Sequence, residues 1–154
     1  DLPAAGAGFS LALACDLIVA AESAKFVMAY VKVGLTPDGG GSWFLSRALP
    51  RQLATEILLE GQAVSAARLH QAGVVNRVVA DGTALEAALQ WATQLAALSP
   101  NACASVKSLL NDAPANTLSA HFNAEKQHFV DALHHRDGLE GITAFLEKRK
   151  ANYQ

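Results

Sequence analysis

Residues 5–26 read AGAGFSLALACDLIVAAESAKF, and their pattern indicates how this part of the chain is built. A glycine turn at residues 5–8 leads into good helix formers at residues 9–15. Residues 16–21 then predict a short buried strand, and residues 24–28 predict a second one. Short strands that alternate with helices are typical of an α/β core.

A glycine-rich loop follows the second strand. Residues 34–41 read GLTPDGGG, which is too rich in Gly and Pro for regular structure, so we interpret them as a functional or connecting loop. The pattern becomes helical from Ser42 to Gly73, with Ser65 placed as an N-cap. Residues 74–80 predict a further strand.

The remainder of the chain is predicted to be helical, because apolar residues recur at helical spacing in each of its segments. The expected helices cover residues 85–98, 102–110, 118–133 and 139–150. We therefore expect an α/β core over residues 1–80 and a helical region over residues 81–154.

Composition and charge argue against two classes of partner. The 154 residues are 51% hydrophobic and 17% charged with a formal net charge of −2, as in a soluble globular protein. Nucleic-acid binding needs a concentrated basic face, and none is visible. The apolar stretch at residues 9–21 is interrupted by Ser10 and Asp16 and is shorter than the roughly 20 apolar residues that a membrane span needs, so we expect no membrane anchor.

The spacing of the cysteines and histidines argues against a disulfide framework and a metal site. Cys15 and Cys103 lie far apart in apolar or helical segments, so we expect a reducing cytoplasm. Four histidines share one helical region but lack a cysteine or carboxylate partner at a ligand spacing, and we expect no metal. They are His121, His128, His134 and His135.

Four segments together resemble the crotonase (enoyl-CoA hydratase/isomerase) family. They are the glycine turn with its helix at residues 5–17, AESAKF at residues 21–26, the loop at residues 34–41, and EGITAFLEKRK at residues 140–150. The resemblance implies the C-terminal part of a crotonase-like ββα spiral, followed by helices that form a homotrimer or hexamer. The family's N-terminal half has no counterpart in this sequence, so we expect it to be missing.

The resemblance implies that the glycine turn binds the oxygen of the reacting thioester. Backbone N–H groups at a helix N-terminus can hold the oxygen of a thioester enolate. The family match makes the N–H of Ala7 one of these donors, while Gly6 and Gly8 let the backbone approach the thioester closely. A plain tight turn is the alternative.

Two positions depart from the family's hydratases, which use a glutamate pair to activate water. Those positions are Ser10 and Tyr30 in this chain. An alcohol and a phenol cannot act as a carboxylate pair near neutral pH, so we predict little hydration of an enoyl-CoA. Tyr30 either lines the acyl pocket or is a partly buried aromatic at a strand end.

Asp38 is the carboxylate to which the resemblance assigns the chemistry, because family isomerases and related aryl-CoA dehalogenases carry an aspartate at the corresponding loop position. Its apolar neighbours are expected to shield it from water, and Trp43 among them to contact substrate. These neighbours are Leu35, Pro37, Trp43 and Phe44. A helix N-cap is the alternative role for Asp38.

The implied substrate is an acyl-CoA thioester, with coenzyme A as part of the substrate and no separate cofactor. Phe145 and Lys148 match family positions that contact coenzyme A, although residues 148–150 also fit a solvated basic helix end. Three functions stay open. Asp38 moves a proton in an isomerase, or attacks as the nucleophile of a dehalogenase or hydrolase, or the chain is a catalytically silent acyl-CoA-binding homologue.

Overall fold

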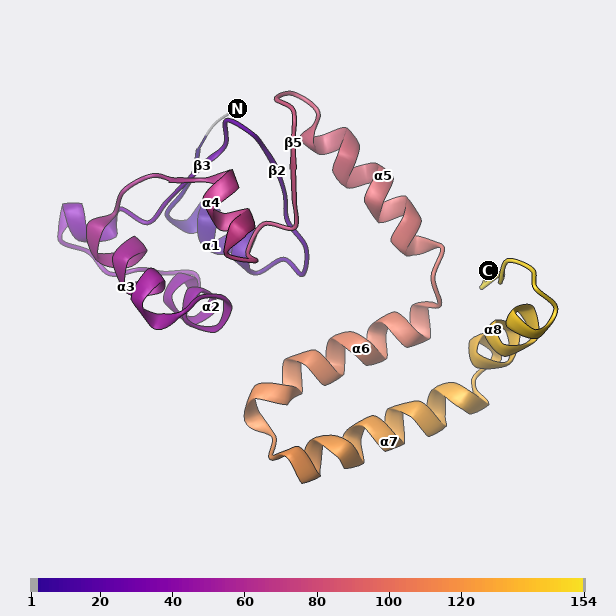
Figure 1. Cartoon of the computed structure of the whole chain (residues 1–154). Helices are drawn as coiled ribbons and strands as arrows, with labels where there is room; N and C mark the ends of the chain where they lie inside the picture. The colour runs from indigo at the N-terminus through magenta and orange to yellow at the C-terminus, as the bar shows by residue number, and fades with distance from the viewer. Residues whose placement is uncertain (1–2, 154) are drawn as a thin grey trace. The chain divides into compact units, whose positions relative to one another are not determined.

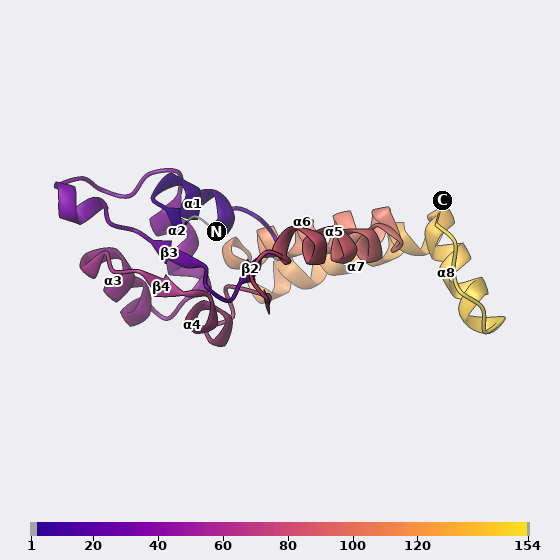
Figure 2. The same cartoon turned by 90° about the horizontal axis from the view of Figure 1, so that it is seen from above.

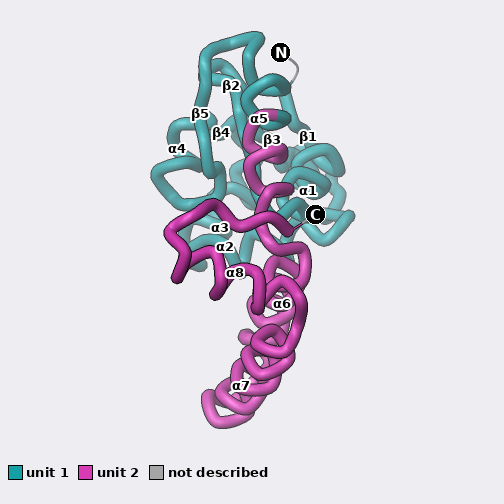
Figure 3. Tube along the Cα trace, turned by 90° about the vertical axis from the view of Figure 1, so that its right-hand side faces the viewer, with its two compact units in different colours: residues 1–89 teal, residues 90–154 magenta. Residues whose placement is uncertain are grey.

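A computed structural model describes residues 3–153. The first two residues and the last, which the expected ranges 1–80 and 81–154 include, lie outside this description. The chain divides into two compact units, Asp1–Leu89 and Gln90–Gln154 (Figure 3). Each unit is described by itself below. The sequence predicts the boundary between the α/β core and the helical region at residue 80. That boundary rests on the expected roles of the two regions as well as on their packing, and it stays a prediction.

The first unit contains two small sheets. In the three-stranded sheet β3 lies between β1, to which it is parallel, and β4, to which it is antiparallel. Figure 2 labels β3 and β4 next to each other. In the other sheet β2 and β5 form a parallel pair (Figure 1). The strands are β1 (Ala4–Ala5), β2 (Val19–Ala21), β3 (Lys25–Val27), β4 (Val64–Ser65) and β5 (Arg77–Val79).

Short helices connect these strands. Helix α1 packs against α2, and α2 packs against α3. As the sequence predicts, the Ser65 hydroxyl caps α4 by accepting a hydrogen bond from the N–H of Arg68 at 3.2 Å. The helices are α1 (Ala7–Leu13), the 3₁₀ helix η1 (Tyr30–Val33), α2 (Gly41–Ala48), α3 (Arg51–Glu60) and α4 (Ala66–Gln71).

One hydrophobic core holds the first unit together. Phe9 from α1 is fully buried and its ring lies 5.0 Å from that of Phe26 on β3. Burying a side chain of this size stabilises a fold by about 1.5–3 kcal/mol. The same core includes Met28, Leu45, Ile57, Leu69 and Val75. It therefore fixes the start of α1 against the end of β3.

Helices make up the second unit, and α5 (Ala84–Ala96) crosses its boundary. Helix α7 packs against both α6 and α8. The buried Asp137 carboxylate accepts a hydrogen bond of 2.8 Å from the Ser99 hydroxyl, which joins the N-terminal ends of α6 and α8. The bounds are α6 (Pro100–Asp112), the 3₁₀ helix η2 (Ala113–Ala115), α7 (Leu118–His134) and α8 (Arg136–Leu146).

The order of strands and helices confirms the predicted α/β organisation with a helical C-terminal region. Among residues 3–153, no helix is long and apolar enough to cross a membrane.

Candidate active site

The glycine turn adopts a conformation that suits glycine. Gly6 has φ +52° and ψ −121°, a combination that side chains with a Cβ rarely adopt. Its N–H donates a 2.8 Å hydrogen bond to the Val27 carbonyl, and its carbonyl accepts bonds of 3.0 Å from the N–H groups of Phe9 and Ser10. Within residues 3–153 no partner is found for the Ala7 N–H, in keeping with its place in the first turn of α1.

Tyr30 lies directly against this turn. It is the first residue of η1, and a Cβ placed on Gly6 would come 3.1 Å from the Tyr30 hydroxyl oxygen. Any other residue at position 6 would push the phenol away. Glycine is therefore needed here for close approach as well as for backbone conformation.

The Tyr30 hydroxyl donates a short hydrogen bond to Oδ1 of Asp38. This bond, assisted by partial burial and by the nearby negative charge, raises the pKa of Tyr30 above its ordinary value of 10. The phenol consequently remains a neutral donor at physiological pH. The structure thus brings the Gly6 turn, Tyr30 and Asp38 together.

The alternative role for Asp38 as a helix cap is wrong. Helix α2 begins at Gly41 with Gly40 as its N-cap, and no side chain in the described part of the chain caps it. The expected shield of apolar neighbours is also not found among residues 3–153. Asp38 is exposed, and so are Leu35 and Trp43.

The sequence interpretation missed the part played by Ser10, which it treated only as an absent glutamate. Ser10 is 1% exposed, and its hydroxyl donates to the backbone carbonyl of Asp38 at 2.9 Å. A buried position was predictable from the apolar helix pattern around Ser10. Its partner was not, because Asp38 lies 28 residues further along the chain.

The family assignment follows from comparison with known proteins. Residues 3–154 match the family model described as enoyl-CoA hydratase/isomerase. The chain belongs to this family. It also superposes on the crystal structure of an enoyl-CoA hydratase from Polaromonas sp. JS666 with a TM-score of 0.96 and 58% identity, covering 99% of this chain and 59% of that one. The crotonase-like fold expected from the sequence is confirmed.

Curated relatives within the enoyl-CoA hydratase/isomerase family have different activities. The chain is 41% identical to 1,2-epoxyphenylacetyl-CoA isomerase of Escherichia coli K12, covering 97% of this chain and 57% of that protein. It is 37% identical to 2,3-dehydroadipyl-CoA hydratase of the same organism, covering 98% and 59%. The chain thus spans less than two thirds of the length of these relatives.

Trp43, which is expected from the sequence to contact the substrate, is a half-exposed residue of α2. The guanidinium of Arg47 lies 3.7 Å from the centre of its ring, and the ring of Phe44 meets it edge-on at 5.0 Å. These contacts hold the indole in place on the helix surface.

Phe145 and Lys148, the predicted contacts for coenzyme A, belong to the second unit. The Phe145 side chain is 82% exposed. Lys148 follows the end of α8 and has φ +55°, in the left-handed region. Its N–H donates to the Phe145 carbonyl at 3.2 Å and the next N–H, of Arg149, donates to the Ala144 carbonyl at 3.0 Å. This pair of bonds is a Schellman motif with lysine where glycine is usual.

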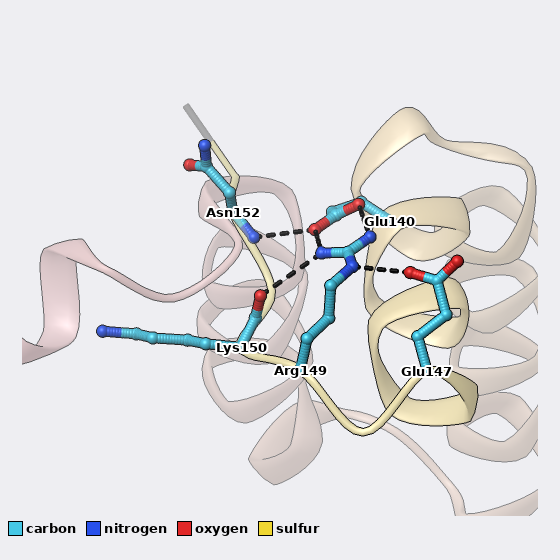
Figure 4. A network of polar contacts seen from close by, with 5 residues as sticks. All are labelled: Glu140, Glu147, Arg149, Lys150 and Asn152. Carbon is cyan, nitrogen blue, oxygen red and sulfur yellow. Dashed lines mark hydrogen bonds and ion pairs between the residues drawn. The ribbon is translucent and has the colours of Figure 1, made fainter.

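The residue after this turn anchors the C-terminal segment (Figure 4). Arg149 makes two hydrogen bonds with Glu140, of 2.6 and 2.9 Å, and one of 2.6 Å with Glu147. Glu140 also accepts from the N–H of Asn152 at 2.8 Å. The arginine bond first, and then the Asn152 N–H, lower the pKa of Glu140 to about 2. The basic run is therefore more than a solvated helix end, because its central residue is paired.

Two of the four histidines bond to the backbone, and a third, His121, lies 3.7 Å from the carboxylate of Glu125, a partner four residues away that the sequence interpretation missed. Within the described residues, no group of three or more His, Cys, Asp or Glu side chains is placed to hold a metal ion. His134 contacts the Val130 carbonyl at 2.8 Å, and His135 caps α8 by accepting from the Asp137 N–H at 3.1 Å.

Proposed function

We propose that the complete protein is an acyl-CoA enzyme that moves a double bond along the acyl chain, with Asp38 as the acid/base. The observation that carries this proposal is the Tyr30–Asp38 hydrogen bond beside the Gly6 turn. It brings the carboxylate of Asp38 next to the turn whose Ala7 N–H has no partner among residues 3–153 and can donate a hydrogen bond to an enolate oxygen.

The proposed reaction is a proton transfer in two steps. The Asp38 carboxylate takes a proton from a carbon of the acyl chain, and the electron pair moves onto the thioester oxygen. The Ala7 N–H then stabilises this enolate oxygen, assisted by Gly6 and Gly8, which let the backbone approach it. Asp38 returns the proton to a different carbon, so that the double bond has moved and no atom is gained or lost.

Tyr30 supports this role by orienting the carboxylate. Its hydroxyl binds one oxygen of Asp38, Oδ1. In the proposed reaction the second oxygen, Oδ2, takes the proton from the substrate. A phenol that stays protonated is suited to this task because it does not compete for the transferred proton.

The isomerase assignment over hydration draws on the residues that replace the glutamate pair. Ser10 is buried and already hydrogen-bonded, and Tyr30 is bonded to Asp38. Neither is placed to activate water as a base. The chain is similar to an isomerase at 41% identity, but also to proteins named hydratases at 58% and 37%, so the assignment depends on the residues at positions 10 and 30.

A second candidate follows from the exposure of Asp38. An accessible carboxylate can attack a carbon directly, as the nucleophile of a dehalogenase or hydrolase. The third candidate, a silent acyl-CoA-binding protein, needs no reacting group.

We propose further that Phe145 and Lys148 contact coenzyme A, that Trp43 contacts the substrate, and that no separate cofactor takes part. The exposure of Phe145 leaves its ring available for such a contact.

Asp38→Asn in the complete protein tests the proposal. If Asp38 transfers the proton, turnover of an enoyl-CoA panel should fall by about a hundredfold to ten-thousandfold with little change in substrate binding. Mass spectrometry should detect solvent deuterium entering the substrate with the wild-type protein but hardly with the variant. Asp112→Asn, an exposed position at the end of α6, is the matched control and should retain full activity.

The other outcomes favour the competing candidates. A covalent acyl or aryl adduct on Asp38 would identify a nucleophile. Binding without exchange or turnover would indicate a silent homologue. Full isomerase activity in Asp38→Asn would overturn the assignment.

A further inference from the structure

We propose that Ser10 is a positioning residue, whose buried hydroxyl holds the backbone of Asp38 in register with the glycine turn. This inference rests on the proposed function where it concerns turnover, but its structural part does not depend on the reaction. Ser10 does not contact the carboxylate that would react. It acts on the peptide from which that carboxylate projects.

The hydrogen bonds around Ser10 join two segments that are distant in sequence. The Ser10 Oγ lies 2.9 Å from the carbonyl oxygen of Asp38 and 3.4 Å from that of Gly6. One hydroxyl has one proton to donate, and the shorter distance identifies the Asp38 carbonyl as its acceptor. The same carbonyl accepts a 3.0 Å bond from the Gly41 N–H. Two donors therefore fix the orientation of the peptide that follows Asp38.

The glycines of the loop pack onto Ser10 at close range. A Cβ on Gly39 would lie 3.1 Å from the Ser10 Cβ, and a Cβ on Gly41 would lie 2.7 Å from the Ser10 Oγ. The loop backbone can rest on α1 only because both glycines lack a side chain and Ser10 has a small one. A glutamate at position 10 has no room unless the loop moves, and moving the loop would also move Asp38.

Position 10 thus carries a different function here from the one that a glutamate would serve. A buried polar group is costly unless it is bonded, and Ser10 meets that requirement by bonding to the loop. With serine instead of glutamate, position 10 has no carboxylate, and its hydroxyl instead holds the backbone that carries the Asp38 carboxylate. The chain is in this way built for a single working carboxylate at Asp38.

Ser10→Ala is the test, because it deletes the hydroxyl and keeps the packing. We expect kcat to fall by about tenfold with KM nearly unchanged, the size that the loss of one hydrogen bond can account for. The contact between Tyr30 and Asp38 should loosen as well. Its independent readout is the titration of the Tyr30 phenol, followed by NMR of ¹³C-labelled tyrosine, whose midpoint should move back toward 10.

Two further variants make the test specific. Ser46→Ala removes a hydroxyl that donates to the Trp43 carbonyl at 3.0 Å on the exposed side of α2, and it should change neither readout. Ser10→Cys keeps a weaker donor and should give values between those of wild type and Ser10→Ala. It also replaces Ser10→Ala as the test if that variant does not fold.

The outcomes separate this inference from the proposed function. If Ser10→Ala shifts the Tyr30 titration while Asp38→Asn is fully active, Ser10 holds the loop and the assigned chemistry is wrong. If both Ser10 variants have the wild-type kcat and the wild-type Tyr30 midpoint, the positioning role is overturned.

Discussion

At the scale of single residues, Tyr30 is the side chain that connects the glycine turn to Asp38. Its hydroxyl bonds to Asp38 and its ring lies against Gly6. The contact uses three positions that are separated in sequence, and each one constrains the others. A larger residue at position 6 would displace the Tyr30 phenol, and the displaced phenol would lose its hydrogen bond to Asp38.

This contact predicts a particular dependence of stability on pH. The folded pKa of Tyr30 lies above its unfolded value of 10, so the contact stabilises the fold below about pH 10 and is lost as the pH rises through the folded pKa. The thermal midpoint of the wild type should therefore fall more steeply than that of Tyr30→Phe above about pH 10. Calorimetry of both proteins over that range measures the difference. Tyr153→Phe is the control, and parallel curves for the wild type and Tyr30→Phe would contradict the prediction.

At the scale of secondary-structure elements, the sequence predicted the long helices and the glycine-rich loop well, because periodicity and turn residues within each segment indicate them. The helices expected at residues 85–98 and 118–133 are found as α5 and α7, with ends shifted by a few residues. The loop at residues 34–41 is irregular up to Gly40, as its glycines and proline indicate. These predictions need only periodicity and turn chemistry.

Elements that depend on distant partners were predicted less well. The strand expected at residues 74–80 shrinks to Arg77–Val79, because the N–H groups of Val74 and Val75 donate to the Leu69 carbonyl at the end of α4. The two-residue strands β1 and β4 were missed, since each exists only through pairing with β3. The bond between Ser10 and Asp38 was missed for the same reason, because it joins residues that are far apart in the sequence. The residue types at the site were predictable, but their contacts were not.

The end of α8 gives a testable case of a residue in an unfavourable backbone conformation. Lys148 has φ +55°, and for a residue with a Cβ the left-handed region costs roughly 1–2 kcal/mol. Lys148→Gly removes this cost but adds entropy to the unfolded chain, so we expect a net stabilisation of about 0.5 kcal/mol. Lys148→Ala keeps a Cβ and should bring no gain. Thermal unfolding of the two variants compares them directly.

Lys148→Gly and Lys148→Ala also test whether the charge of Lys148, as distinct from its backbone conformation, contributes to ligand binding. If the ammonium group of Lys148 contacts coenzyme A, both substitutions should weaken binding to a similar extent, whatever they do to stability. Calorimetric titration with coenzyme A measures this. Destabilisation by Lys148→Gly relative to Lys148→Ala would contradict the backbone argument.

At the scale of the whole molecule, the two units differ in how they bury apolar residues. The first has a continuous core of aromatic and aliphatic side chains. In the described part of the second, residues 90–153, only Asp137 and Ala144 are buried. Large apolar side chains remain exposed on each of its helices, among them Val106, Leu110, Phe122, Phe129 and Ile142. Monomeric proteins rarely leave so much apolar surface uncovered.

We propose that these helices mediate assembly into a homotrimer or a hexamer of the complete protein. Phe122 and Phe129, which are 58% and 68% exposed, lie seven residues apart on α7 and so share one face of the helix. A glutamate on this face would have to be desolvated in the assembled form, which is costly without a partner. Phe129→Glu should therefore shift the complete protein toward smaller species in sedimentation or light scattering at micromolar concentration. Asn123→Glu adds the same charge at an exposed polar position of α7 and should leave the assembly intact. A wild-type protein that stays strictly monomeric while folded would refute the proposal, and equal dissociation by both variants would assign the effect to net charge instead of to the apolar face.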